Sequence, residues 1–573
     1  RSTQAKTLFP YTTLFRSESI SVLDNFFAIG GHSLLAMRLI ASVKDSLGVL
    51  LPLKTLFDFP SVRALAPHLV QRTQDLLTAL VAGKGTKQDN SVFLSYGQER
   101  LWTLDQVEGA SATYNMPSLI RLKDQVNLEA LSRAINMLVM RHEPLRTVIE
   151  SDPVSLPVGK ILPAQDATVD IEIIENAASR FDEIVKIESA KYFDLRSQLS
   201  IRVTLLTEQA RHLALLITFH HQACDGASRE IFFKELDSAY SAFASGINPA
   251  LPINPISYAD WAFWQKENVS NELASKIERA QDRLRNMPEL LTLPLDYVRN
   301  SDRSRHAGYV HSRLPNELVI QLEALANKLN TTLFSVLLGA YAFTLHKIAG
   351  QKELVIGVPA SGRTQTETTR LMGMFVNMLA IPFEFSHLAT TDALILQTKN
   401  IVQDVLNDQD LSFERLLEDL HTTRSLDYSP VFQTMFAYQN STDLSLSLAA
   451  AVDTLSEVEL PTAKYDLSLF ITLDRNQTLQ CNFEFDADLF KYENVESWTK
   501  CFTTVLNNLT HAHDRPLAEL SYYDDKVLQA LLTDALAAAP TNAFNDLLDG
   551  FARSVGKFAS ATAITFTDSH QPQ

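Results

Sequence analysis

The chain has 573 residues, of which 46% are hydrophobic and 20% are charged, as in soluble globular proteins. This length predicts three or four folding units. The formal net charge of −17 disfavours nucleic acid as a partner, because phosphate binding needs a basic surface. The 3 cysteines are widely spaced, which fits a reducing compartment and no metal site. No apolar run reaches the ~20 residues that a membrane helix needs, so we expect a cytoplasmic protein.

Residues 1–17 are basic, contain no acidic residue and repeat the pair Leu-Phe on either side of Pro10. A transit peptide would share the basic, acid-free composition, but this segment has no helical stripe. We therefore treat it as non-native-looking and leave it out of the fold prediction.

Residues 18–72 are predicted to form a small helical unit. Two glycines precede Ser33, a good N-cap residue for a helix that ends at Gly48. A second helix should run from Val62 to Val70, after a Pro-Ser pair. Residues 73–91 then turn polar and contain glycine, which predicts a linker.

Ser33 has three possible roles. A hydrolase nucleophile would need glycine two residues later, where Leu35 stands. A plain N-cap is the structural explanation. A modification site is the third, because the preceding glycines leave the hydroxyl accessible and a helix N-terminus stabilises an attached phosphate.

The motifs around Ser33 closely resemble the peptidyl carrier domain of non-ribosomal peptide synthetases. They are Asp24-Asn25-Phe26-Phe27, Gly30-Gly31-His32-Ser33-Leu34, Leu56-Phe57 and Pro60-Ser61. The resemblance implies that a phosphopantetheinyl transferase attaches 4′-phosphopantetheine to Ser33. It also implies that the first carrier helix, expected before Asp24, is missing.

A mixed α/β region should fill residues 92–525, because strand-like apolar runs alternate there with amphipathic helices. We expect strands at 170–174, 202–206, 213–219 and 354–358, and helices at 128–141, 228–244, 316–330 and 332–348. The length suggests two lobes, 92–270 and 271–525. Residues 526–573, with an expected helix at 544–558 and strand at 563–566, are interpreted as a linker and the start of another domain, which resembles an adenylation domain.

The densest group of chemically useful side chains is His220–Gly226, directly after a strand-like run. A pair of core histidines is the structural explanation. Four specified residues within seven favour instead an imidazole held for proton transfer and a carboxylate, Asp225, held for geometry. If the segment stays extended, His221 and Asp225 share one face and His220 and Cys224 the other. That arrangement argues against a thiol nucleophile paired with His221, although a turn would weaken the argument.

The central pattern is two histidines, three variable residues and then Asp-Gly. Together with further motifs in the same order, it resembles the condensation domain of non-ribosomal peptide synthetases. The further motifs are Ser95-Tyr96-Gly97-Gln98-Glu99-Arg100-Leu101-Trp102, Tyr114-Asn115-Met116-Pro117, Arg141-His142-Glu143-Pro144-Leu145-Arg146-Thr147, Tyr258-Ala259-Asp260-Trp261-Ala262-Phe263-Trp264, Ile356 to Arg363, Gly373-Met374-Phe375-Val376-Asn377, Leu411-Ser412-Phe413-Glu414, Pro430-Val431-Phe432-Gln433 and Tyr465-Asp466-Leu467.

The resemblance implies a multidomain protein: a small all-α carrier bundle followed by an α/β condensation domain of two chloramphenicol-acetyltransferase-like lobes. The implied reaction is amide-bond formation between two carrier-bound substrates, with the histidine motif at the lobe junction. His221, next to His220, would take a proton or orient the amine, and the sequence leaves that choice open. Gly226 would let backbone approach the reacting centre and donate its N–H to an oxyanion. No metal is needed, because a thioester is already activated.

Asp225 is expected to pair with an arginine for structure. Arg141 is our first choice and Arg363 our second, and Arg146 is counted with them as structural support.

The implied partners are a downstream aminoacyl carrier domain, the adenylation domains of the same assembly line and the phosphopantetheinyl transferase, with no membrane and no nucleic acid. An ordinary L-donor subtype is favoured, because no epimerase-sized region separates carrier and condensation segments and the two histidines are not replaced by aspartates. Three alternatives remain: a coenzyme A-dependent acyltransferase of the same fold, an epimerase-type relative, and a non-catalytic docking platform, which should have lost the active histidine.

Overall fold

The computed structural model describes residues 80–523 with short gaps at 88, 110, 152–156, 268–270, 301–302, 421–426, 441–445, 474–477 and 512–513. It also describes scattered residues of 21–68, and residues 529 and 533. Ser33, the expected helix at 544–558 and the expected strand at 563–566 lie outside the described residues.

The described part of residues 21–68 contains one complete short helix, α5 (Val62–Leu65), followed by the 3₁₀ turn η1 (Ala66–His68). The Ser61 hydroxyl caps α5 by accepting the Ala64 N–H at 3.3 Å. The predicted helix therefore begins at Val62 as expected, but its α-helical part ends at Leu65, because Pro67 has no N–H to continue the ladder. The buried hydrophobic residues described in this region are Phe26, Leu39, Val43, Leu51, Leu56 and Leu65.

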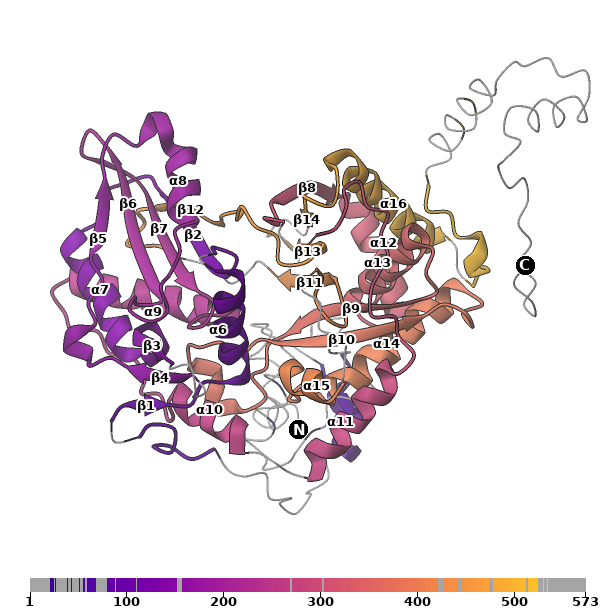
Figure 1. Cartoon of the computed structure of the whole chain (residues 1–573), viewed down its shortest axis with the longest axis horizontal. Helices are drawn as coiled ribbons and strands as arrows, with labels where there is room; N and C mark the ends of the chain where they lie inside the picture. The colour runs from indigo at the N-terminus through magenta and orange to yellow at the C-terminus, as the bar shows by residue number, and fades with distance from the viewer. Residues whose placement is uncertain are drawn as a thin grey trace, which may run out of the picture. The chain divides into compact units, whose positions relative to one another are not determined.

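The first large sheet has five strands, in the spatial order β12 (Val452–Glu457), β2 (Asn115–Leu122), β7 (Arg211–His220), β6 (Ile201–Glu208) and β5 (Ile171–Ile174). Its neighbours are antiparallel except for β5 and β6. Figure 1 shows β7 near the middle of this sheet, with helices α7 (Leu128–Arg141), α8 (Phe181–Ser189) and α9 (Gly226–Ala244) around it.

Strand β7 is buried on both faces, which explains its continuous apolar sequence. Leu215, Ile217 and Phe219 join the core that includes α7 and α9. Ala214 and Leu216, on the other face, pack with side chains of α8. The strand thus delivers its last residue, His220, from the interior of the lobe.

A three-stranded sheet of β1 (Ser91–Val92), β4 (Val158–Ile161) and β3 (Thr147–Glu150) lies in the same half of the chain. The same half of the chain also contains helices α6 (Tyr96–Glu108) and α10 (Tyr258–Glu267). Its 3₁₀ turns are η2 (Glu143–Arg146), η3 (Ala164–Asp166) and η4 (Ala178–Arg180).

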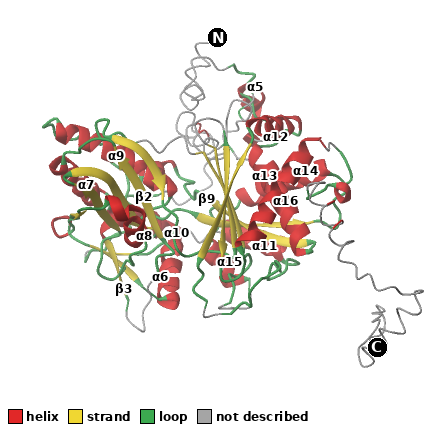
Figure 2. Ribbon diagram, turned by 90° about the horizontal axis from the view of Figure 1, so that it is seen from above, coloured by secondary structure: helices red, strands yellow, loops and turns green. Residues whose placement is uncertain are grey.

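The second large sheet has six strands, in the order β10 (Asn377–Glu384), β9 (Glu353–Ala360), β11 (Thr434–Asn440), β13 (Leu467–Leu473), β14 (Leu479–Asp486) and β8 (Ala307–Leu314). One face packs against α12 (Asn316–Lys328), α13 (Leu333–Ala349), α14 (Thr391–Leu406) and α16 (Tyr492–His511). The other packs against α11 (Asn271–Leu284) and α15 (Phe413–Asp419). Figure 2 shows the first group of helices stacked beside the sheet. The 3₁₀ turns η5 (Thr366–Arg370) and η7 (Leu517–Glu519) complete this half.

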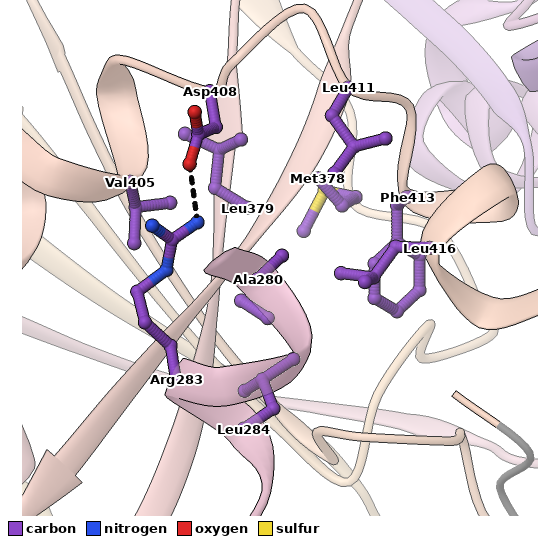
Figure 3. Close-up of a pocket in the computed structure, with 11 residues that line it drawn as sticks. Ala280, Arg283, Leu284, Met378, Leu379, Val405, Asp408, Leu411, Phe413 and Leu416 are labelled. Atoms are coloured by element: carbon purple, nitrogen blue, oxygen red, sulfur yellow. Dashed lines mark hydrogen bonds and ion pairs between the residues drawn. The ribbon is translucent and has the colours of Figure 1, made fainter. Parts of the chain in front are cut away.

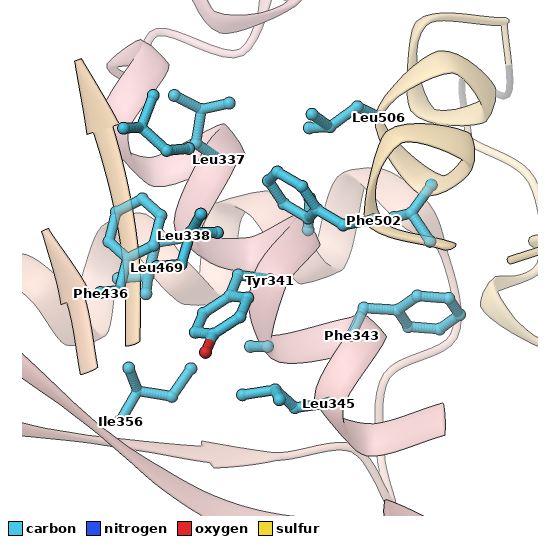
Figure 4. Close-up of a cluster of buried hydrophobic side chains, with 14 of the residues drawn as sticks. Leu337, Leu338, Tyr341, Phe343, Leu345, Ile356, Phe436, Leu469, Phe502 and Leu506 are labelled. Atoms are coloured by element: carbon cyan, nitrogen blue, oxygen red, sulfur yellow. The ribbon is translucent and has the colours of Figure 1, made fainter. Parts of the chain in front are cut away.

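Tyr341 lies at the centre of the second core, among side chains of α13, α16 and the sheet (Figure 4). Its ring lies 5.8 Å from that of Phe436 and 6.2 Å from that of Phe502. Its hydroxyl bonds to the Thr434 hydroxyl at 2.6 Å, so the one polar atom on this buried ring is satisfied. Among the described residues no single helix could span a membrane, although α12 and α13 pass the length and hydropathy test as a pair bent by 104°.

The elements predicted within residues 92–525 are confirmed in type, and their bounds shift by a few residues. Helix α7 has the predicted bounds, while α9 begins two residues earlier, because Asp225 is its N-cap. Strand β12 was not predicted. In sequence it lies between β11 and β13 of the second sheet, yet it pairs with β2 of the first sheet. Its polar sequence fits an edge position.

Candidate active site

The chain turns immediately after β7 instead of staying extended. The His221 N–H donates to the Tyr114 carbonyl at 2.9 Å, and the Ala223 N–H donates back to the His220 carbonyl at 3.0 Å. The argument that alternate residues from His220 to Asp225 share one face is therefore wrong, because it assumed an extended segment.

His220 is a core residue. Its side chain is 5% exposed, its Nδ1 accepts the Gln222 N–H at 3.2 Å, and its ring meets the edge of the Phe193 ring at 5.9 Å. Burial, aided by the charges of His221 and Lys464, lowers the pKa of His220 to about 3. A neutral, hydrogen-bonded imidazole here shapes the turn.

His221 is more exposed than His220, and its Nδ1 is buried with no hydrogen-bond partner among the described residues. Burial lowers the pKa of His221 to about 4, and the positive charge of Lys464 adds to the effect, while the Asp225 carboxylate opposes it. At neutral pH the imidazole is therefore uncharged, and because Nδ1 is closed off from solvent, a substrate could reach the ring only at Nε2. Such a group can accept a hydrogen bond or a proton from a substrate.

Cys224 is excluded as a nucleophile, for a reason other than the one the sequence suggested. Its side chain is fully buried, its sulfur donates to the Asp225 carbonyl at 3.4 Å, and burial raises the pKa of the thiol well above its usual range. A buried, protonated thiol is inert.

Asp225 organises the site through both carboxylate oxygens. Oδ1 accepts the N–H and the hydroxyl of Ser228, each at 2.7 Å, which caps α9, and Oδ2 accepts the Phe375 N–H at 3.1 Å. Arg363 Nη2 donates to Oδ1 at 3.0 Å. The second choice of arginine partner is therefore correct.

The first choice, Arg141, is wrong. Its guanidinium pairs with Glu235 of α9, Nε to Oε2 at 3.0 Å, and Glu235 also bonds to His142 at 2.8 Å. Because Glu235 lies ten residues beyond Asp225, the cap of the same helix, their backbone positions are about 15 Å apart along the helix axis. Arg146 also has a different partner from the expected one, since it donates to the Leu162 carbonyl at 2.5 Å.

Gly226 is the first residue of α9 and is exposed. A Cβ built on it would meet no atom within 4 Å. Its N–H is one of those that a helix leaves without an intrahelical acceptor, and it lies at the positive end of the helix dipole.

Residues of several motifs to which the sequence assigned no role form hydrogen bonds around the histidine turn. Gln98 donates to the Gln222 carbonyl at 3.0 Å. The Tyr258 hydroxyl donates to the Met374 carbonyl at 2.8 Å and bonds to the Ser95 hydroxyl at 2.9 Å. These bonds join segments from both halves of the chain around the histidine turn, and no local pattern in the sequence could have paired them.

A separate groove lies between α11, β10 and α15 (Figure 3). It encloses about 350 Å³, including the part open to solvent, and Arg283 pairs with Asp408 at its edge at 2.8 Å. The groove shares no residue with the histidine turn.

Family models place these features in a known context. One described as condensation domain matches residues 88–532, and one described as phosphopantetheine attachment site matches residues 14–69. The chain belongs to the condensation-domain family. The carrier match begins at residue 14, inside the segment 1–17 that we set apart.

The condensation domain and its carrier region resemble parts of much longer synthetases. The chain is 33% identical over 521 residues to malpinin synthetase of Mortierella alpina, covering 90% of this chain and 7% of that protein. It is 32% identical over 529 residues to a dimodular nonribosomal peptide synthase of Bacillus subtilis (strain 168), covering 90% and 22%. The chain thus spans less than a quarter of the length of these relatives.

Solved structures show the same fold. The X-domain in complex with OxyB from teicoplanin biosynthesis superposes with a TM-score of 0.71 at 22% identity, over 78% of this chain and 98% of that one. The first condensation domain of the CDA synthetase superposes with a TM-score of 0.62 at 18% identity, over 75% and 98%. The expected carrier region followed by a condensation fold is confirmed.

Proposed function

We propose that the histidine turn of this condensation domain forms an amide bond between a donor acyl thioester and the amine of an acceptor aminoacyl group, each delivered by a carrier domain. The observation that carries the proposal is the uncharged, partly exposed imidazole of His221, close in sequence to the exposed first residue of α9. The similarity to a nonribosomal peptide synthase supports it.

The reaction needs one proton to move. The amine nitrogen bonds to the thioester carbonyl carbon, the carbon–sulfur bond breaks, and the proton lost by the nitrogen ends on the departing thiolate. His221 is too weak a base to deprotonate a free α-ammonium group, whose pKa is about 8. Its properties instead favour orienting the neutral amine and relaying the much more acidic proton of the tetrahedral intermediate.

Two neighbours of His221 would complete this site. The Gly226 N–H can stabilise the oxyanion on the former carbonyl oxygen. Asp225, held by Arg363, fixes the start of α9 and therefore the direction of that N–H.

The chain contains a phosphopantetheine attachment region, and we propose Ser33 as the modified residue. The bound arm supplies the thiol that carries an acyl group. Ser33→Ala should show no added mass after incubation with coenzyme A and a phosphopantetheinyl transferase. Full modification of that variant would contradict the assignment.

The decisive experiment is amide formation with both carriers loaded. We expect His221→Ala to slow it about 100-fold or more, the usual contribution of a positioned proton-transfer group. His212→Ala removes a partly buried histidine near the start of β7 and should leave the rate within about twofold. Equal rates in wild type and His221→Ala would contradict the role of His221.

The same assay separates the alternatives. Turnover of free acyl-coenzyme A at the carrier-bound rate would identify a free acyltransferase, and deuterium exchange at the donor α-carbon would identify an epimerase. Binding of loaded carriers with no product would identify a docking platform. The intact His221 favours catalysis over a docking platform. An L-configured donor is favoured because no epimerase-sized region separates the carrier and condensation segments, and a D-configured donor reacting faster would contradict this subtype.

A further inference from the structure

Lys464 comes from the second half of the chain but acts on the histidine turn. It lies just before β13, in a segment that follows the edge strand β12 of the first sheet. Its ammonium lies 5.6 Å from the centre of the Tyr114 ring. The carbonyl of the same Tyr114 accepts the backbone N–H of His221 at 2.9 Å. Tyr114 therefore lies next to the Lys464 ammonium through its ring and next to the His221 backbone through its carbonyl.

The segment that carries Lys464 is held rigidly. Asp466, two residues later, is 5% exposed and accepts a hydrogen bond from Arg299 at 3.0 Å. Its N–H donates to the Gln433 carbonyl at 3.0 Å. Arg303 lies against the same carboxylate at 3.6 Å and pairs with Asp486 at 2.7 Å. This buried network gives the motifs around Gln433 and Asp466 a structural reason: they fix the backbone at the base of the lysine.

Charges of both signs surround Lys464. Glu484 and Glu457 face it with negative charge and Arg100 with positive charge, while burial lowers the pKa of Lys464. The backbone N–H of Lys464 also donates to Glu484 at 3.4 Å. Lys464 is half-buried, so its charge is screened less by water than that of a fully exposed lysine.

Other charged groups face His221 from their own elements. Asp225, at the cap of α9, favours the protonated imidazole, and Arg229 of α9 disfavours it. His220, at the end of β7, is the other neighbour. Of the cations that act on His221, Lys464 has the larger effect and is the one that comes from the second half of the chain.

We propose that Lys464 is a positioning residue of the condensation site, which holds the His221 imidazole and an incoming acceptor amine in their uncharged forms. A fixed positive charge disfavours a second one nearby, so both the group that receives the proton and the nucleophile are kept neutral. The effect on His221 is independent of the proposed function, whereas the effect on the amine rests on it.

The first test does not depend on turnover. Diethyl pyrocarbonate modifies only neutral imidazole, and mass spectrometry of the His221 peptide follows its reaction against pH. A peptide with a free histidine serves as the reference, and its reactivity is first corrected for the ionisation of its own imidazole. Relative to this reference, the reactivity of wild-type His221 should stay constant from about pH 7.5 to about pH 5. In Lys464→Met it should fall about twofold over that range, because the pKa of His221 rises but stays below its ordinary value while the burial remains. An unchanged profile in Lys464→Met would overturn the proposal.

Matched variants separate charge from structure. Lys464→Arg keeps the charge and should keep the flat profile, whereas Lys464→Gln removes it with a polar chain in place and should behave like Lys464→Met. Lys266→Met removes another lysine that lies over a tyrosine ring, Tyr96, at 3.7 Å, and should leave the His221 profile unchanged. A shift in the Lys266→Met variant equal to that in Lys464→Met would overturn the assignment to Lys464.

The second test is the pH profile of amide formation. Lys464→Met should lose more activity at about pH 6.5 than at about pH 8.5, because both the imidazole and the amine gain protons at the lower pH. An equal loss at every pH would contradict the effect on the amine. If the wild type forms no amide while the pyrocarbonate profiles still differ, the proposed function fails and the role of Lys464 toward His221 stands.

Discussion

Arg363 and Asp225, 138 positions apart in the sequence, form a buried ion pair at 3.0 Å. The side chains are 5% and 1% exposed. Arg363 also donates to the Thr368 and Leu371 carbonyls at 2.5 and 2.7 Å. Because Asp225 caps the helix that begins beside His221, this pair ties the loop after β9 to the geometry of the histidine turn.

Loss of this pair should destabilise the fold strongly. In Arg363→Met the Asp225 carboxylate stays buried without its cation, and removing one partner of a buried pair costs about 3–5 kcal/mol. Urea unfolding measures the change. Arg415→Met breaks an exposed pair with Glu418, whose partners are 40% and 53% exposed, and should cost about 0–1 kcal/mol. Equal losses in the two variants would show that the Arg363 pair is hydrated in solution.

Stability should fall as the solution is acidified from about pH 6.5. His220 and His221 have folded-state pKa values of about 3 and about 4, below their ordinary value of 6.5. Between these limits the unfolded chain binds more protons than the folded one. The stabilisation from keeping both imidazoles neutral is therefore complete above pH 6.5 and is lost as pH falls toward the folded values.

His220→Asn tests this dependence, because its amide oxygen can still accept the Gln222 N–H. Each such histidine contributes a slope of at most about 1.4 kcal/mol per pH unit. We expect the urea midpoint of His220→Asn to change less between about pH 7 and about pH 4.5 than that of the wild type. Parallel midpoints across this range would contradict the low pKa of His220.

The elements that were predicted carry strong local patterns, but of the described strands only β5, β6, β7 and β9 were predicted individually. The bounds of α7 follow from its amphipathic stripe and its Asn127 cap, and β7 follows from an apolar run that is buried on both faces. Strand β12 was missed for the opposite reason. Its residues are mostly polar, and only pairing with β2 makes them a strand.

The site was predictable in composition but not in geometry. The sequence marked His221, Asp225 and Gly226, yet it offered no means of choosing Arg363 over Arg141, because the distance between an arginine and a carboxylate depends on tertiary packing. Lys464 was passed over, although the neighbouring Tyr465-Asp466-Leu467 was marked. A single lysine gives no local signal, and its effect on His221 exists only because β12 and β13 bring it near Tyr114.

The groove between α11 and α15 depends on Phe413 for its wall. This side chain is 2% exposed, and its ring lies 5.1 Å from that of Phe432. Phe413→Ala should lower the free energy of unfolding by about 3–5 kcal/mol, because it enlarges an existing cavity. Phe413→Leu keeps most of the volume and should cost less than about 1.5 kcal/mol. Similar losses in the two variants would contradict a packing role for the ring.

Gly226→Ala separates the needs of the fold from those of the reaction. The added methyl group meets no protein atom within 4 Å, and alanine is a good residue for the first turn of a helix, so the free energy of unfolding should change by no more than about 0.5 kcal/mol. The same methyl group would occupy the open space at the N-terminus of α9, where the donor carbonyl must approach the Gly226 N–H. We therefore expect amide formation to fall about 10-fold to 100-fold, as for a weakened oxyanion donor, with thermal melting unchanged. A variant as active as the wild type would show that the reacting carbonyl does not approach this N–H.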